Sequence, residues 1–278
     1  MNQPRGPKLA LIAAIFLAVS PRSAWAQSTV SARMLRVNDI EMYVELRGSG
    51  DPLVLLHGFG GCGQGWRPIV DRLAEQYQVI IPDLRGHGRS TNPAGTFTHQ
   101  QSALDVYALL EQLGVKNFSA MGISTGGMTL LHMATQQRDR ITAMVLIGAT
   151  SSFPEEARVI MRATSTDSTP PPFYRACTSR GDSQARELAA QFGRFKDSYD
   201  DMNFTTPYLG TIRARTLIVH GDRDQFFPVS IPVEMYRAIP GAALWIVPEG
   251  GHVPIFGTHL REFEDVVGAF LRGLRTPR

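Results

Sequence analysis

The sequence predicts a protein of the α/β class, in which helices cover a parallel sheet. Short, uninterrupted apolar runs are typical of strands that such a sheet buries on both faces. This chain has them at 53–56, 79–81, 118–121, 143–147, 216–219 and 244–247. Amphipathic helical patterns separate several of these runs. With 278 residues, of which 43% are hydrophobic, the chain is long enough to bury one sizeable core.

Local patterns predict the remaining elements of the core. Residues 34–48 alternate apolar and polar side chains, which is typical of a hairpin of two half-buried strands. Thr98 is expected to cap a helix that has Gln101 in its first turn and ends at Gly114. Its apolar face consists of Ala103, Val106, Tyr107, Leu110 and Leu113. Another apolar stripe predicts a helix at 260–271.

Residues 151–208 break the alternation of strands and helices. They show no convincing strand pattern, only amphipathic fragments joined by the proline-rich sequence STPPPFY. This region is therefore expected to be a small helical insertion that divides the core into residues 27–150 and 209–278.

Residues 1–26 are interpreted as a targeting segment. Arg5 and Lys8 precede an apolar stretch at 9–19, and Ala24-Trp25-Ala26 provides a small-x-small cleavage site. The alternative is a membrane anchor, but a spanning helix needs about 20 apolar residues. We expect a cleaved Sec-type signal, no stable membrane anchor afterwards, and export to a periplasm or the medium.

Charge and cysteine content argue against two classes of function. The first 26 residues hold three of the 28 Lys and Arg residues and no acid, so 25 basic residues remain against 25 acidic ones. A nucleic-acid-binding protein needs a basic surface, and none is predicted here. Cys62 and Cys177 lie in no pattern with zinc-ligand spacing, so no metal site is predicted. Whether these two residues form a disulfide stays open at this point.

The motif with the clearest chemistry is Gly122-Ile123-Ser124-Thr125-Gly126, a G-x-S-x-G between a strand pattern and a helical pattern. A serine at such a sharp turn presents its hydroxyl above the carboxyl end of the sheet. The helix N-terminus beneath it favours developing negative charge. Because a serine hydroxyl attacks only when a positioned base removes its proton, Ser124 needs a histidine partner.

His252 is the best candidate for that base, because it follows the last apolar run on a loop that can reach the sheet edge. The other histidines considered are interpreted as surface or packed residues: His99, His132 and His259. An orienting acid is expected before the base in chain order. Asp222 and Asp224 both follow the run at 216–219. Asp224 lies further out on the loop and is preferred, whereas Asp222 is expected to stabilise the turn.

Five segments in order resemble the α/β-hydrolase superfamily over roughly residues 35–275: HGFGG, PDLRGHGRS, GISTGG, HGDRDQFFP and PEGGH. The resemblance implies an eight-stranded, mostly parallel sheet flanked by helices, with a small helical cap inserted after the sixth strand and no cofactor. It implies that Ser124 is the nucleophile, Asp224 the acid and His252 the base. STGG is similar to a segment of bacterial arylesterases and cofactor-free haloperoxidases. Haloalkane dehalogenases and epoxide hydrolases have an aspartate where this chain has Ser124.

The resemblance also gives a role to the glycine-rich segment 58–63, which formally matches the dinucleotide-binding pattern G-x-G-x-x-G and is followed by an acid, Asp83. In the superfamily, the backbone N–H after His-Gly binds a developing oxyanion. Here that residue is Phe59, paired with Thr125. Asp83 is then expected to fix its own loop.

The chemistry implied is hydrolysis of carboxylic esters of small molecules through an acyl-enzyme. Lactonase, C–C bond hydrolase, amidase and perhydrolase activities remain alternatives, as does a non-catalytic ligand-binding role. Apolar side chains near the site and in the insertion are expected to bind substrate, and among them are Trp66, Phe153, Phe173 and Phe226. They indicate uncharged, aromatic or short-chain acyl substrates. The oligomeric state is not predicted.

Overall fold

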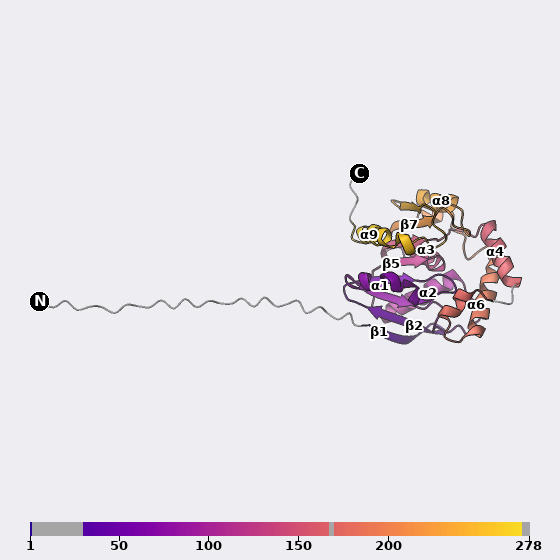
Figure 1. Cartoon of the computed structure of the whole chain (residues 1–278), viewed down its shortest axis with the longest axis horizontal. Coiled ribbons are helices and arrows are strands. Elements are labelled where there is room, and N and C mark those ends of the chain that lie inside the picture. Colours follow the sequence, from indigo (N-terminus) through magenta and orange to yellow (C-terminus); the bar gives the residue numbers. More distant parts are fainter. Residues whose placement is uncertain (2–29, 167–169, 274–278) are drawn as a thin grey trace.

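The predicted strands form one eight-stranded sheet at the centre of the molecule (Figure 1). The computed structural model describes residues 1, 30–166 and 170–273, so the targeting segment predicted at 1–26 lies almost wholly outside the described residues. The strands are β1 (Ser31–Val37), β2 (Ile40–Arg47), β3 (Asp51–Leu56), β4 (Tyr77–Pro82), β5 (Phe118–Ile123), β6 (Ile141–Ile147), β7 (Arg215–Gly221) and β8 (Ala243–Val247).

The sheet is mostly parallel, as predicted. Its order is β1-β2-β4-β3-β5-β6-β7-β8. β1 and β2 form the expected antiparallel hairpin, and β2 pairs antiparallel with β4. The other neighbours are parallel, and each of the six apolar runs lies in one of these strands. Because parallel strands end at the same edge, the loops after β3, β5, β7 and β8 come together there.

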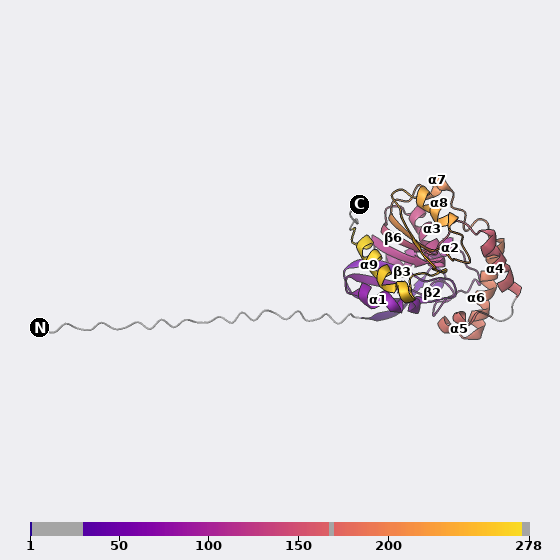
Figure 2. The same cartoon turned by 45° about the horizontal axis from the view of Figure 1, so that its top comes forward.

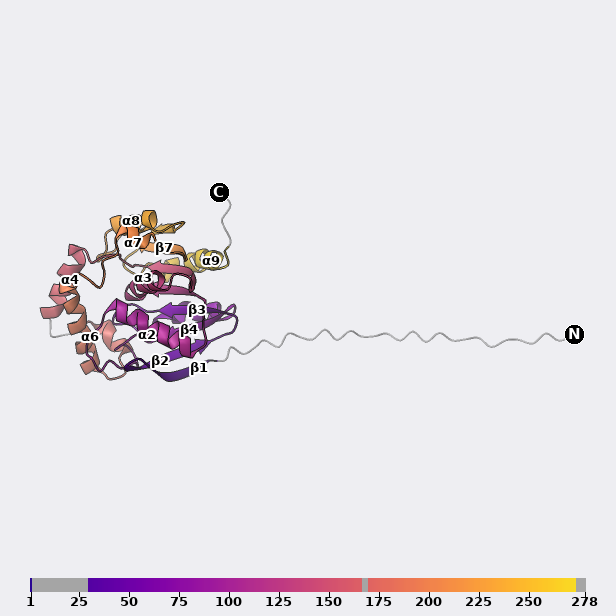
Figure 3. The ribbon, with the colours of Figure 1, turned by 180° about the vertical axis from the view of Figure 1, so that it is seen from behind.

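Helices cover both faces of the sheet, so that each face has its own hydrophobic core (Figures 1 and 3). One face packs against α1 (Arg67–Ala74) and α9 (Leu260–Leu271). The other packs against α2 (His99–Gln112), α3 (Thr125–Gln136) and α8 (Ser230–Ala238). Short 3₁₀ turns, η1 (Gly63–Trp66) and η3 (Gly257–His259), precede α1 and α9.

The predicted start and end of α2 are confirmed. Thr98 accepts a hydrogen bond from the backbone N–H of Gln101 at 3.0 Å. Gly114 follows the helix with a φ of +71°, a conformation that costs glycine little. The Gln101 side chain, however, donates to Asp105 instead of returning to the cap.

Between β6 and β7 the described residues form helices and one isolated β-bridge, as predicted for a helical insertion. The helices are α4 (Glu155–Thr166), α5 (Pro172–Cys177), α6 (Asp182–Arg194), η2 (Phe195–Asp197) and α7 (Thr206–Leu209). α4 and α6 lie beside each other at one end of the molecule (Figures 1 and 2). A bridge between Ser152 and Asn203 joins the two ends of the insertion. We call α4, α5, α6 and η2 the cap.

The structure answers whether Cys62 and Cys177 form a disulfide. Cys62 lies on the loop after β3 and Cys177 ends α5, and the two form a disulfide with a Cα–Cα distance of 5.6 Å. The disulfide therefore links the cap to the core.

Candidate active site

Ser124 lies at a strained turn between β5 and α3. Its φ of +50° and ψ of −115° fall in a region that L-residues rarely adopt. The flanking glycines make this turn possible by close packing. A Cβ at Gly122 would lie 2.4 Å from the backbone of Gly126, and one at Gly126 would lie 2.2 Å from the carbonyl oxygen of Leu56.

Three side chains from separate loops form one hydrogen-bonded chain at the carboxyl edge of the sheet. The Ser124 Oγ–H donates to His252 Nε2 at 2.9 Å. The Nδ1–H of His252 donates to Asp224 Oδ2 at 2.8 Å. A carboxylate can only accept, so Asp224 fixes the imidazole tautomer that leaves Nε2 free to take a proton.

The Asp224 carboxylate is buried and held on both oxygens. Its side chain is 0% exposed, and Oδ1 accepts from the backbone N–H groups of Phe226 at 2.8 Å and Phe227 at 3.2 Å. His220 lies 3.7 Å from Oδ2 but donates to the carbonyl of Phe227 at 2.9 Å. Burial lowers the pKa of His220, so this imidazole is neutral and does not compete with His252 for the charge of Asp224.

Asp222, the alternative acid, does not reach His252. Its side chain is 34% exposed, and the nearest cation is Arg223 at 4.0 Å. Its backbone N–H donates to Val247, but its carboxylate makes no hydrogen bond to the described residues, so the expected turn-stabilising bond is absent. Glu155 and Glu156 lie in the first turn of α4 and also stay outside the hydrogen-bonded chain.

The structure places the backbone N–H groups predicted to bind an oxyanion next to Ser124. Thr125 is the first residue of α3, and Phe59 lies on the loop after β3, where Gly58 packs against Ser124. Neither N–H donates to another described residue. Both are therefore available to a ligand.

A cavity of about 460 Å³ opens at Ser124 and His252 beneath the cap. Phe153, Phe173 and Phe226 line it as predicted, together with Phe59 and Tyr174. No Asp, Glu, Lys or Arg of the described residues lines it. Aliphatic residues that the sequence did not indicate complete the wall, and these are Ile123, Met128, Ile160 and Val253.

The prediction that Trp66 binds substrate is wrong. Its side chain is 0% exposed and packs on the opposite face of the sheet, in the core shared with α1 and α9. The sequence does not reveal on which face of the sheet an aromatic residue just after the glycine loop packs.

A second buried histidine–aspartate pair supports the turn at Ser124. His99 Nδ1–H donates to Asp201 Oδ2 at 2.6 Å, and Thr125 Oγ1 lies 3.4 Å from His99 Nε2. The backbone N–H groups of His99 and Gln100 also donate to the Asp201 carboxylate. Burial by itself raises the pKa of Asp201, but the hydrogen bonds from His99 and Gln100 outweigh it and hold this pKa at about 2.

This pair gives a testable pH dependence of stability. The pKa of Asp201 is about 2 in the folded protein against 3.8 for the free side chain. Its contribution is therefore complete above about pH 4 and is lost as the pH falls towards 2. We expect Asp201→Asn to lower the unfolding free energy at pH 7 by about 2 kcal/mol. In urea titrations, the gap between variant and wild type should shrink from pH 4 to 2, and a constant gap would contradict the assignment.

Asp83 acts within its own loop, as predicted. Its carboxylate accepts from the backbone N–H groups of Gly63 at 2.8 Å and Arg89 at 2.9 Å. The acid that a dinucleotide would need for its ribose is thus bonded to the glycine loop itself. The antiparallel hairpin before β3 also departs from a dinucleotide-binding unit, which opens its domain with a parallel strand.

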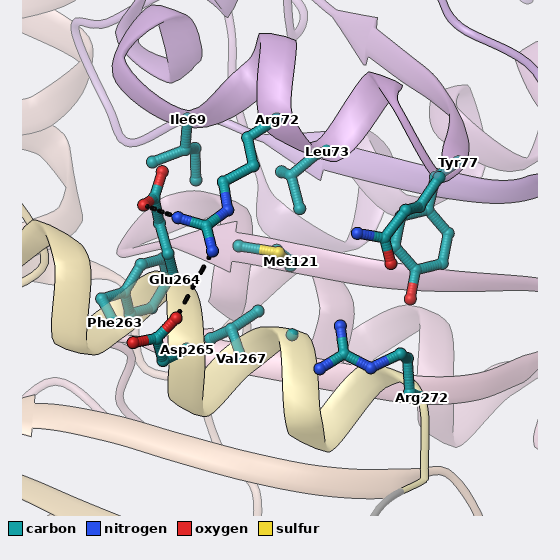
Figure 4. A pocket seen from close by; sticks show the side chains of 12 residues that line it. Ile69, Arg72, Leu73, Tyr77, Met121, Phe263, Glu264, Asp265, Val267 and Arg272 are labelled. Carbon is teal, nitrogen blue, oxygen red and sulfur yellow. Dashed lines mark hydrogen bonds and ion pairs between the residues drawn. The ribbon is translucent and has the colours of Figure 1, made fainter.

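Another cleft, of about 200 Å³, lies between α1 and α9 (Figure 4). Arg72 points between Glu264 and Asp265, at 2.6 and 3.4 Å. None of the described residues that line it is a Ser, Cys or His. In the part of the chain that the structure describes, no three His, Cys, Asp or Glu side chains gather as metal ligands. None of its helices is both long and apolar enough to cross a membrane.

Comparisons with known proteins agree with this fold. A family model described as the alpha/beta hydrolase fold matches residues 51–196. A soluble epoxide hydrolase from Corynebacterium sp. is 38% identical over 125 residues, 42% of this chain and 44% of that protein, so the match spans less than half of its length. Human serine hydrolase BPHL is 29% identical over 277 residues, covering 91% of this chain and 90% of that protein.

Similar proteins along the whole chain include further hydrolases. A 2-hydroxy-6-oxo-6-(2'-aminophenyl)hexa-2,4-dienoic acid hydrolase from Metapseudomonas resinovorans is 23% identical, covering 88% of this chain and 92% of that protein. A bacterial membrane phospholipase A shares the fold with a TM-score of 0.75 and 24% identity, covering 89% of this chain and 87% of that one. Since the family model matches more than half of the sequence, this chain belongs to the α/β-hydrolase fold family.

Proposed function

We propose that this protein hydrolyses carboxylic esters of small molecules through an acyl-enzyme on Ser124. The observation that carries the proposal is the hydrogen-bonded chain from Ser124 through His252 to Asp224. Ser124 and His252 line an apolar cavity in which a substrate could bind. The serine in place of the aspartate of epoxide hydrolases supports acyl transfer over epoxide opening.

The geometry suits each step of acyl transfer. His252 Nε2 takes the proton of Ser124 as Oγ attacks the ester carbonyl, and Asp224 stabilises the imidazolium that forms. The N–H groups of Phe59 and Thr125 bind the oxyanion. His252 then protonates the leaving alcohol, and water attacks the acyl-enzyme with the same base.

The charge of the cavity supports neutral substrates. A buried carboxylate without a cationic partner is strongly unfavourable, and no Lys or Arg of the described residues lines the cavity. The relative from Metapseudomonas resinovorans acts, by its name, on a dienoic acid. For this chain the uncharged lining favours a neutral ester over C–C bond hydrolysis of such an acid.

Two measurements test the proposal. A fluorophosphonate should add one covalent group to the wild type in intact mass spectrometry and none to Ser124→Ala. A panel of p-nitrophenyl esters with acyl chains of two to sixteen carbons should then define the acyl preference. A folded wild type that stays unlabelled would favour a non-catalytic ligand-binding role. Labelling without ester hydrolysis would favour amidase or perhydrolase chemistry, and faster turnover of cyclic esters would favour a lactonase.

We also propose that the protein is exported. The support is the basic, apolar and small-residue order of 1–26 in the sequence. Expressed with its natural start, the exported protein should begin at Gln27. N-terminal sequencing checks this, and an exported protein that retains residues 1–26 would refute it.

A further inference from the structure

The Cys62–Cys177 disulfide joins the two parts of the chain that border the cavity. Cys62 is three residues beyond Phe59, on the loop that carries a proposed oxyanion donor. Cys177 is the last residue of α5, in the cap, and lies 115 positions further along the chain. The bond thus fixes one wall of the cavity relative to the reacting centre.

That wall consists of two aromatic side chains of α5. Phe173 is 59% exposed and lines the cavity at its rim, whereas Tyr174 is 2% exposed. The ring of Tyr174 packs so closely on Gly60 that a Cβ at this glycine would lie 2.0 Å from it. On its other side Tyr174 contacts Ala185 and Leu188 of α6, which lies next to α5 (Figure 2).

The oxyanion loop is held in place without the disulfide. The Gly58 carbonyl accepts from the N–H of Gly61 at 3.1 Å and from His57 Nδ1 at 2.8 Å. The N–H of Gly63 donates to Asp83. The ring of Phe59 is surrounded by five others, those of His87, Phe97, Tyr174, Phe192 and Phe195. Loss of the disulfide should therefore leave the oxyanion donors in position.

α5 has fewer connections to the core than this loop has. The ion pair of Arg175 with Asp182 is exposed and stays within the cap. The hydrogen bonds from the cap to the core begin after α5, where Ser179 donates to Gly88 and Gln184 donates to Gly86 and Gly88. Within α5 itself, the packing of Tyr174 and the disulfide are the contacts with the core, and the bonds from Ser179 to Gly88 follow two residues after the helix ends.

We propose that the Cys62–Cys177 disulfide determines the range of acyl groups that the enzyme accepts, by holding Phe173 and Tyr174 as a preformed wall of the cavity. The inference rests on the proposed ester hydrolysis. A short acyl group contacts Ser124 and the oxyanion donors and does not need the wall. A longer acyl group must pack against it, and without the disulfide its binding has to order both side chains.

The disulfide can be opened by a reductant. Both cysteines line a separate cavity of about 250 Å³, and Arg67 and Arg89 line it too. A water-soluble phosphine attacks one sulfur, the S–S bond breaks, and water hydrolyses the phosphonium to the phosphine oxide. The phosphine is oxidised by two electrons, and two thiols form.

The test compares p-nitrophenyl acetate with p-nitrophenyl hexanoate on the wild type, before and after phosphine treatment, and on Cys62→Ala/Cys177→Ala. We expect the KM for hexanoate to rise about tenfold after reduction and in the double variant. The KM for acetate should change less than about twofold and kcat for both esters should stay similar. The double variant with phosphine controls for the reagent. Phe173→Ala with the disulfide intact should raise the hexanoate KM in the same direction, because it removes part of the wall.

The outcomes separate this inference from the proposed function. If the oxidised wild type hydrolyses neither ester, the proposed function fails and the inference fails with it. If the wild type hydrolyses both esters and the ratio of the hexanoate KM to the acetate KM does not change when the disulfide is lost, the inference alone is overturned. An equal fall in kcat for both esters would also overturn it, because the disulfide would then act on the reacting centre. All rates are measured below the melting temperature of the double variant, so that unfolding does not contribute.

Discussion

Replacing Asp224 by asparagine should lower kcat for ester hydrolysis by about 10⁴-fold while the protein stays folded. The carboxylate accepts the Nδ1–H of His252 at 2.8 Å, and an amide in its place can turn its NH₂ group towards the ring. His252 would then carry its proton on Nε2, which faces Ser124, and the base would be lost. The backbone bonds from Phe226 and Phe227 can persist to the amide oxygen, which preserves the loop.

Asp222→Asn is the matched control, because it makes the same chemical change two residues away. Among the described residues, the one ion pair of the Asp222 side chain is with Arg223, at 4.0 Å. Its kcat should therefore stay within about twofold of the wild type, as for other surface substitutions. Steady-state rates and melting curves of both variants check this. A dead Asp222→Asn with an active Asp224→Asn would reverse the assignment, and two active variants would place the acid elsewhere.

Sequence reasoning could locate Ser124, Asp224 and His252 together because of a property of parallel sheets. Each residue follows an apolar run, and the carboxyl ends of parallel strands share one edge. The contact between them then follows from topology. The preference for Asp224 over Asp222 depended on loop position, and the structure supports it because two backbone N–H groups turn the Asp224 carboxylate inward.

Features that depend on which way a helix or loop turns could not be predicted. Trp66 is an aromatic residue of the kind that often lines a pocket. The η1 turn instead directs its side chain into the core that the sheet shares with α1 and α9. The cavity wall includes aliphatic side chains such as Met128 and Ile160, which look like ordinary core residues in a sequence.

Contacts between the core and the insertion at 151–208 also could not be predicted from the sequence. Cys62 and Cys177 are 115 residues apart, and His99 and Asp201 are 102 apart. Neither pair belongs to a periodic pattern, because one partner lies in the core and the other in the insertion. The docking of the insertion brings them together, and no local propensity encodes that arrangement.

The largest loss of activity is expected at Ser124, where two equally inactive variants should differ in stability. Both Ser124→Ala and Ser124→Gly remove the hydroxyl and should lower kcat by about 10⁶-fold, since neither leaves a nucleophile. The two variants should differ in stability. At φ +50° and ψ −115° alanine keeps the backbone strain of serine, whereas glycine adopts this conformation freely.

We therefore expect Ser124→Gly to be more stable than Ser124→Ala by about 1 kcal/mol, even after the greater entropy of glycine in the unfolded chain is included. For a protein of this size that difference corresponds to roughly 2–4 °C in melting temperature. Thermal denaturation of the wild type and both variants checks the order. Equal melting temperatures for the two variants would mean that the backbone at Ser124 is not strained in solution. Residual ester hydrolysis near the wild-type rate in either variant would remove Ser124 as the nucleophile, whatever the stabilities show.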